Sequence, residues 1–125
     1  MAAPNLVNVT SITGKIDGHK LTTDAIDNSN SAVITCASNK LIKINSIIVA
    51  NVDGSDSVNI DIAVHLDADD RFYLAKTVAL PADSTLVVIG KDSPIYLEES
   101  DQLEARADVA SDAELVVSYE ILDDA

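Results

Sequence analysis

Two acidic turns are the first segments whose residue types could do chemistry. DGSD at 53–56 and DADD at 67–70 both offer carboxylate oxygens, which calcium prefers as ligands. DGSD lacks an EF-hand pattern, because the twelfth residue counted from Asp53 is Val64 and not a glutamate. The strand between the turns holds them roughly 30 Å apart, so one ion cannot join them. The weak candidates for a calcium site are therefore Asp67, Asp69 and Asp70. Turn formation and solubility explain both segments without an ion.

Catalytic groups are few. His19 and His65 have no neighbour in sequence that suggests a base–nucleophile pair, and Cys36 is the single cysteine. Paired carboxylates of the glycosidase type stay open, but such sites need aromatic platforms and aromatic residues make up only 3% of the chain. Four glycines form no phosphate-binding loop. We therefore expect no enzyme, no cofactor and no resident metal.

Charge is strongly asymmetric along the chain. The formal net charge is −13, yet residues 1–50 hold four bases against three acids, while residues 51–125 hold four bases against eighteen acids. Nucleic acid and anionic membranes are therefore not expected as partners. Either the acids simply cover solvent-facing strand positions, or the nearly neutral first part faces a protein partner. The N-terminus reads neither as a signal peptide nor as a membrane span.

Hydrophobic residues alternate with polar ones over most of the chain. In IIVANVDGSDSVNIDIAVHL, from Ile47 to Leu66, two alternating runs flank DGSD, which predicts a β-hairpin. The inward set on the first run is Ile42, Ile44, Ile48, Ala50 and Val52. One core is expected to contain Ile48, Ile60, Val64, Leu74, Leu103 and Val117, and Phe72 is expected to point inward with Leu74.

The N-terminal third is less regular. Strands are expected near residues 6–12, 20–26 and 32–37, with Gly14 and Gly18 flanking a tight turn between the first two. No segment has a sustained period of 3.6 residues. About eight to ten short strands with frequent turns predict one all-β domain over residues 1–125, an antiparallel β-sandwich of the jelly-roll-like kind.

Residues 1–20 form the segment most suited to contact a partner. Its charge is balanced, its strand pattern is weak, and small polar side chains could hydrogen-bond to a neighbouring backbone or add a strand to it. These side chains are Asn5, Asn8, Thr10, Ser11 and Thr13. The alternative is that this stretch is simply the first strand of the sandwich.

Several phrases resemble a set of small structural proteins of tailed bacteriophages, cyanophages among them. They are NVTSITGK, KINSIIVANVDGSDSVNIDIAV, LAKTVALPADSTLVVIGKDSPIYLEESDQLEA and ELVVSYEIL, and they span about residues 5 to 122. The resemblance implies a virion protein that is assembled in the host cytoplasm. Its leading form is a head decoration (cement) protein, which would bind the major capsid protein or another virion protein and form a homo-oligomer, commonly a trimer.

Two other functions stay open at the sequence level. A neck or tail accessory protein would have the same sandwich with a different symmetry and copy number. A carbohydrate-binding module would need exposed aromatic side chains on a concave sheet, and the low aromatic content argues against it.

Overall fold

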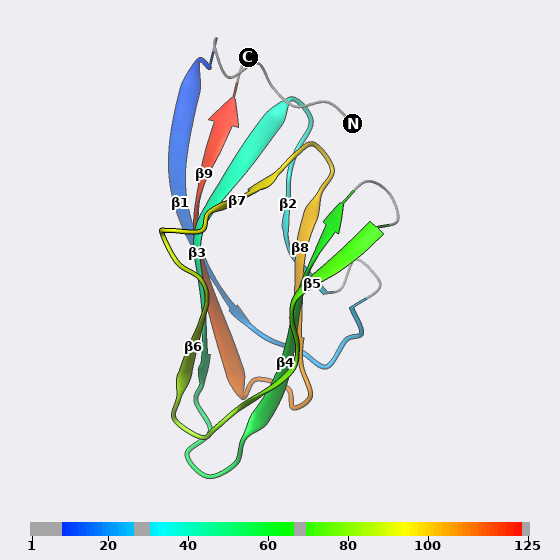
Figure 1. Cartoon of the computed structure of the whole chain (residues 1–125), viewed down its shortest axis with the longest axis vertical. Coiled ribbons are helices and arrows are strands. Elements are labelled where there is room, and N and C mark those ends of the chain that lie inside the picture. Colours follow the sequence, from blue (N-terminus) through cyan, green and yellow to red (C-terminus); the bar gives the residue numbers. More distant parts are fainter. Residues whose placement is uncertain (1–8, 27–30, 67–69, 124–125) are drawn as a thin grey trace.

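The computed structural model describes residues 9–26, 31–66 and 70–123 (Figure 1). Alternating hydrophobic residues and short polar turns produce extended segments. These are β1 (Ser11–Lys20), β2 (Ala32–Thr35), β3 (Lys40–Asn51), β4 (Val58–Leu66), β5 (Asp70–Leu80), β6 (Thr85–Ile89), β7 (Ile95–Leu97), β8 (Gln102–Ala107) and β9 (Ala113–Asp123). The described residues contain no helix that could cross a membrane.

The strands form two antiparallel sheets packed face to face. Sheet A has the order β1-β9-β3-β6, with β7 also pairing with β3, and sheet B has the order β2-β8-β4-β5 (Figure 1). The chain passes back and forth between the sheets, which is the winding of a jelly roll. The prediction of an all-β sandwich is confirmed. The two edge strands of sheet A are β1 and the β6–β7 pair.

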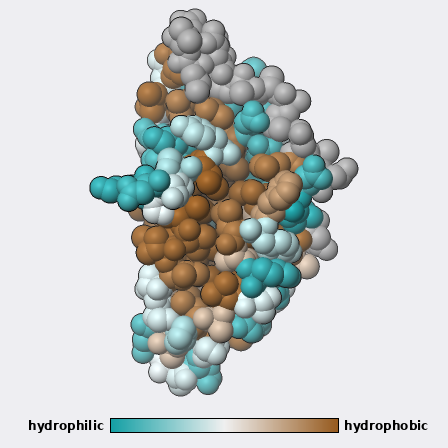
Figure 2. All heavy atoms as spheres, viewed as in Figure 1, coloured by the Kyte–Doolittle hydropathy of each residue, from teal (hydrophilic) through white to brown (hydrophobic). Residues whose placement is uncertain are grey.

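The core fills the space between the sheets with aliphatic side chains. Inward alternation is as predicted on β4 and β9, where Ile60, Ile62, Leu115 and Val117 are fully buried. The core reaches the surface along one side, where β5, β6 and β7 carry apolar side chains that are only partly buried, and Figure 2 shows them gathered over the middle of that side. They are Leu74, Val78, Leu86, Val88 and Ile95.

A β-bulge in β3 reverses the predicted inward set. The pairing of β3 with β9 shifts between Ile44 and Ser46, so that Asn45 is an extra residue. After the bulge, Ile47 is fully buried and Ile48 is 36% exposed. The prediction that Ile48 and Val52 point into the core was therefore wrong. A strict period of two cannot anticipate one inserted residue, because that residue moves every later side chain to the other face.

The predicted hairpin between residues 47 and 66 was also wrong. β3 lies in sheet A and β4 lies in sheet B, so DGSD crosses from one sheet to the other. Buried Asn51 fixes this crossing: its amide donates to the carbonyls of Asp56 and Leu80 at 2.9 Å, and its side-chain oxygen accepts from Asp53 N at 2.9 Å. The turn residues fit either connection. The pairing partner is decided by distant strands that the local pattern does not contain.

The N-terminal prediction needs a similar correction. No turn separates Gly14 from Gly18, because β1 runs through both and pairs with β9 without a register shift. Neither glycine has a positive φ. The predicted strand over 20–26 is absent, since β1 ends at Lys20 and the following segment crosses to sheet B. The prediction of a strand near 32–37 is confirmed in outline by β2.

β5 also departs from strict alternation. Its pairing with β4 shifts twice, and Thr77 at the first shift has a φ of 50°. As a result Ala75 is buried, Leu74 is half-buried, and Phe72 is 56% exposed. The prediction that Phe72 is a core residue was wrong, because the two irregularities change which β5 side chains reach the core.

Candidate interaction surface

The outer face of sheet A carries an uncovered row of apolar side chains. The register places Gly18, Val116, Ile48 and Val87 side by side across β1, β9, β3 and β6. Val87 is 59% exposed, and Ile16, two residues before Gly18, is 69% exposed. Neighbours two apart on a strand share a face, so Ile16 belongs to the same surface. Contiguous exposed apolar side chains of this kind mark contact surfaces. We call this surface the A face.

Charges on the A face balance one another. The charged side chains with outward parity on its strands are Lys20 and Glu114, joined at 3.1 Å, and Lys43 and Glu120, which are cross-strand partners. Glu120 also accepts a hydrogen bond from the Asn45 amide at 3.2 Å. Two cations therefore meet two anions on one face of a molecule whose net charge is −13. The face lacks the repulsive field that the rest of the chain would present to another protein.

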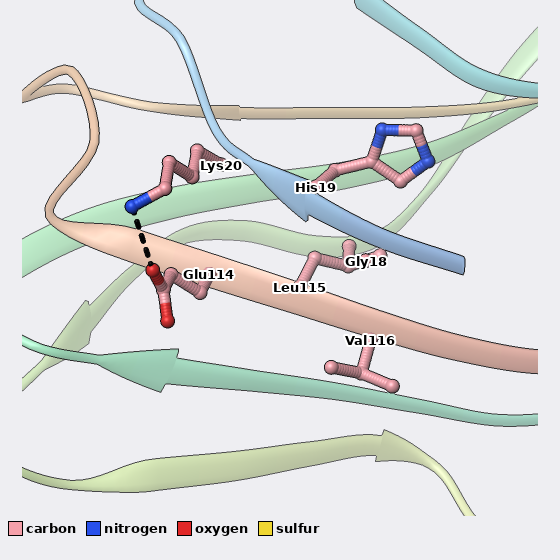
Figure 3. Close-up of a pocket in the computed structure, with 6 residues that line it drawn as sticks. All are labelled: Gly18, His19, Lys20, Glu114, Leu115 and Val116. Carbon is pink, nitrogen blue, oxygen red and sulfur yellow. Dashed lines mark hydrogen bonds and ion pairs between the residues drawn. The ribbon is translucent and has the colours of Figure 1, made fainter. Parts of the chain in front are cut away.

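A hollow of about 260 Å³ lies over Gly18 (Figure 3). The Lys20–Glu114 ion pair stands at one end, Val116 lines the hollow, and the imidazole of His19 points away from the ion pair. A Cβ on Gly18 would come no closer than 3.9 Å to Leu115 O, and a Cβ on Gly14 would meet nothing within 4 Å. A glycine inside a strand weakens it, and packing within the described chain requires neither of these.

β1 leaves one backbone edge open. In the part of the chain that the structure describes, its strand partner is β9 alone. Leu21 N donates to Ala113 O at 2.9 Å, which fixes the alternation of the antiparallel ladder. The N–H groups of the residues at even positions from Gly14 to Gly18 therefore point away from β9. An unprotected edge of ten residues can accept an added strand.

The predicted partner-contact residues fall in three groups. Asn5 and Asn8 lie outside the described residues. Thr10 is exposed but engaged, since its backbone N and its Oγ1 both donate to Asp123 O, at 2.8 and 3.0 Å. Ser11 and Thr13 are exposed at the start of β1. Their place in β1 means that this part of the segment is indeed the first strand of the sandwich, while its contact with a partner stays a prediction.

The outer face of sheet B differs from the A face because a buried carboxylate on it is paired with an arginine. Glu104 on β8 is fully buried, and Arg71 on β5 reaches both of its oxygens, with Nε at 2.6 Å and Nη2 at 3.3 Å. His65 Nδ1 lies 3.8 Å from Glu104 Oε2. A carboxylate removed from water needs such partners, so this cluster is accounted for by the fold.

A second ion pair on sheet B binds the crossing segment. Asp61 is buried and accepts from Arg106 Nη1 at 3.2 Å and from Thr77 N at 2.5 Å. Arg106 Nη2 also donates to the Thr23 carbonyl at 3.4 Å. A second hollow, of about 270 Å³, lies between these groups, and Lys76 Nζ sits 4.7 Å above the ring of Tyr73 beside it. Residues 22–26 thus cover part of sheet B, whereas no described segment covers the A face row.

The acidic turn DGSD has hydrogen bonds of its own. Asp53 Oδ1 accepts from Ser55 N at 2.8 Å and from Asp56 N at 3.3 Å, and these bonds lower the pKa of Asp53. Asp67 and Asp69 lie outside the described residues, and Asp70 is exposed at the start of β5. Among the described residues, no group of three acids, histidines or cysteines is placed to hold a metal ion. DGSD is thus a self-bonded turn.

The groups considered for catalysis are dispersed over the described chain. Cys36 is buried beside β2, and burial raises its pKa to about 11, so its thiol is protonated at neutral pH. His65 belongs to the Glu104 cluster on sheet B, whereas His19 is on β1 in sheet A. Cys36 Sγ donates to Lys40 O at 3.2 Å.

Sequence reasoning missed the A face. A signal existed, because residues 12 to 20 alternate Ile, Gly, Ile, Gly and Lys with Thr, Lys, Asp and His. The two glycines were interpreted as a turn, which hid a strand with one apolar face. Ile48, Val87 and Val116 could not be grouped with Ile16, because their adjacency depends on pairing between strands that are far apart in the sequence.

Comparison with known proteins adds no relative: no protein-family model matches the chain, and no curated protein matches it.

Proposed function

We propose that the protein is a non-enzymatic structural component of a tailed-phage virion, most specifically a decoration protein that binds the outer surface of the head. The observation that carries the proposal is the contrast between an acidic molecule and a side on which exposed apolar residues lie among balanced charges, formed by the A face and β1. Such a side suits permanent contact with protein. The phage-like phrases of the sequence supply the virion as the setting.

The free edge of β1 is the proposed attachment to the major capsid protein or another virion protein. A partner strand would hydrogen-bond to the open N–H and C=O groups, and the exposed Ser11 and Thr13 side chains flank that contact. Binding across neighbouring capsid subunits would add free energy that opposes internal pressure, repeated over many copies. The acidic DGSD turn would stay in solvent, and the negative charge of the molecule would keep particles apart.

A carbohydrate-binding module is less well supported. Jelly rolls occur in lectins as well as in viral capsids, so the fold alone does not choose between them. The Tyr73 ring on sheet B has Lys76 above it rather than an open face for a sugar. A neck or tail location would use the same β1 edge, and the copy number in a density map of the particle separates it from the head.

Strand addition is tested by Gly14→Pro with Gly14→Ala as the matched control. Both variants place a Cβ in open space, but only proline removes the N–H that points to the free edge. Co-sedimentation with particles assembled without the protein should be lost for Gly14→Pro and kept for Gly14→Ala. Equal binding of the two would refute attachment through this edge. A native virion that lacks the protein would refute the function itself.

A further inference from the structure

We propose that the A face is the contact between two copies of this chain, packed face to face about a two-fold axis with Ile16 of each copy over the hollow at Gly18 of the other. This inference concerns the face of sheet A, whereas attachment to a virion partner uses the edge of β1. It replaces the trimer that the phage resemblance implies with a dimer, and it does not depend on the virion.

The shape of the A face favours a second copy. Ile16 is 69% exposed and stands between two glycines on the same face of β1, each about 6.6 Å away along the strand. A protruding side chain beside two positions without side chains is complementary to itself. A two-fold axis uses the same patch on both subunits, so each Ile16 can fill the space that the partner's glycines leave open.

Electrostatics favours the same occupant. A basic partner would be drawn to the acidic turns and not to a face where Lys20 and Lys43 offset Glu114 and Glu120. Rotation about a two-fold axis can bring the cations of one copy to the anions of the other. Because two copies of charge −13 repel each other at long range, we expect the dimer to strengthen as salt screens that repulsion.

The area of the face is sufficient. β1, β9 and β3 have at least ten residues each, and β6 and β7 together line the remaining edge with five and three residues. At about 4.8 Å between strands and about 3.3 Å per residue, the face covers roughly 600 Å² per copy. Two copies would bury about 1,200 Å², the lower end of the range for specific protein interfaces. The row from Gly18 to Val87 would lie at its centre, where water is excluded most completely.

Sedimentation equilibrium of the purified full chain tests the proposal with two pairs of variants. Ile16→Lys should weaken dimerisation at least tenfold, although the added lysine lowers the net repulsion. Thr13→Lys adds the same charge on the other face of β1 and should leave the dimer unchanged. Gly18→Val should raise the melting temperature of the monomer, because valine favours strands, and yet weaken the dimer by filling the hollow.

The outcomes separate clearly. A dimer that is weakened by Ile16→Lys and Gly18→Val and not by Thr13→Lys supports the proposal. A wild-type chain that is monomeric at high concentration overturns it, as does a trimer or a dimer that tolerates both A-face variants. A monomeric chain whose Ile16→Lys variant loses particle binding also overturns it and assigns the face to a virion partner. If Ile16→Lys loses particle binding while its dimer stays intact, the dimer proposal is overturned, and the result also counts against the proposed attachment through β1.

Discussion

The two outer faces of the sandwich differ in how many of their side chains have partners within the described chain. On sheet B, Arg71 holds the buried Glu104, and Arg106 joins the buried Asp61 to the crossing segment at Thr23. On sheet A, the row that contains Val116, Ile48 and Val87 has no such cover in the described chain. The charged groups on the outer face of sheet B are paired within the chain, whereas the apolar side chains of the A face are exposed.

This difference separates residues that stabilise the fold from residues that do not. Covering charged groups within the fold costs desolvation and is repaid only by good geometry, as at Glu104 and Arg71. Leaving apolar side chains and strand glycines in solvent gives the monomer no stability. The proposed contact would give these residues a role that folding of the described chain does not. The two faces should therefore respond differently to substitution, with stability affected on one and association affected on the other.

The largest expected effect is at Ile47, next to the β3 bulge. Ile47→Asp places a carboxyl in the core and should reduce the free energy of unfolding by on the order of 5 kcal/mol, enough to unfold the chain. Ile48→Asp, one residue further on the A face, should cost under about 1 kcal/mol. Urea denaturation of the two variants measures both. Similar losses would show that the bulge at Asn45 is misplaced.

The next largest effect is expected on the outer face of sheet B. Arg71→Ala leaves Glu104 buried without its main partner and should cost roughly 3 kcal/mol, the lower end of the range because Arg71 touches solvent. The matched variant on the A face is Ile16→Ala, which should change the free energy of unfolding by less than about 0.5 kcal/mol. A costly Ile16→Ala in the monomer would contradict the view that the A face contributes nothing to folding.

A smaller effect appears in alkaline solution and concerns the core behind the A face. Burial, together with the bond of its hydroxyl to Asp17 Oδ2 at 2.6 Å, raises the pKa of Tyr119 from 10.0 to about 12. Burial raises the pKa of Cys36 from 9.0 to about 11. The unfolded chain therefore loses these protons first. The stability that these two groups contribute should be fully present at neutral pH and should be lost as pH rises from 9 to 12.

Two tyrosine variants isolate the contribution of Tyr119. Tyr119→Phe should cost about 1 kcal/mol at neutral pH, because a buried hydrogen bond is lost, and should flatten the decline above pH 10. Tyr96→Phe removes an exposed hydroxyl and should alter neither. Thermal denaturation from pH 7 to 11.5 provides the comparison. The same alkaline slope in Tyr119→Phe as in the wild type would count against this account.

The smallest effect concerns the acidic turn segments DGSD and DADD. Treatment with a calcium chelator should leave the melting temperature almost unchanged, because DGSD is held by its own hydrogen bonds to Asp53. A fall of many degrees would reveal a structural ion, since a ligand bound only by the native state raises stability by mass action. Asp67→Asn and Asp69→Asn would then show whether the DADD turn holds it.

Local sequence patterns predicted the features that depend on residues close together in the chain. Alternation on β4 and β9 correctly placed Ile60, Val64 and Val117 in the core, and the turn signals gave a sandwich. Prediction failed where one residue changes the period, as at Asn45, and where glycine continues a strand, as at Gly14 and Gly18. Glycine permits a turn without requiring one, so pairing with β9 decides the outcome.

The pairing of strands that lie far apart in the sequence could not be predicted from local alternation. The partners of β4 are β8 and β5 and not β3. The burial of Glu104 follows from the position of β8 between β2 and β4, together with Arg71 on β5. The A face has the same origin, because its central row draws one residue from each of four strands. The separate residues are visible in the sequence, but their shared surface appears only after the sheets are assembled.

Thiol labelling in assembled particles tests most directly whether the A face side of the molecule makes the contacts. Cysteines introduced at Val87 on the A face and at Ala79, which is exposed on β5 of sheet B, can be compared because the native Cys36 is buried and protonated. Relative to the dilute free protein, we expect labelling in the particle to slow at least tenfold for Val87→Cys and to stay unchanged for Ala79→Cys. Equal labelling rates at position 87 in the two states would contradict the central claim.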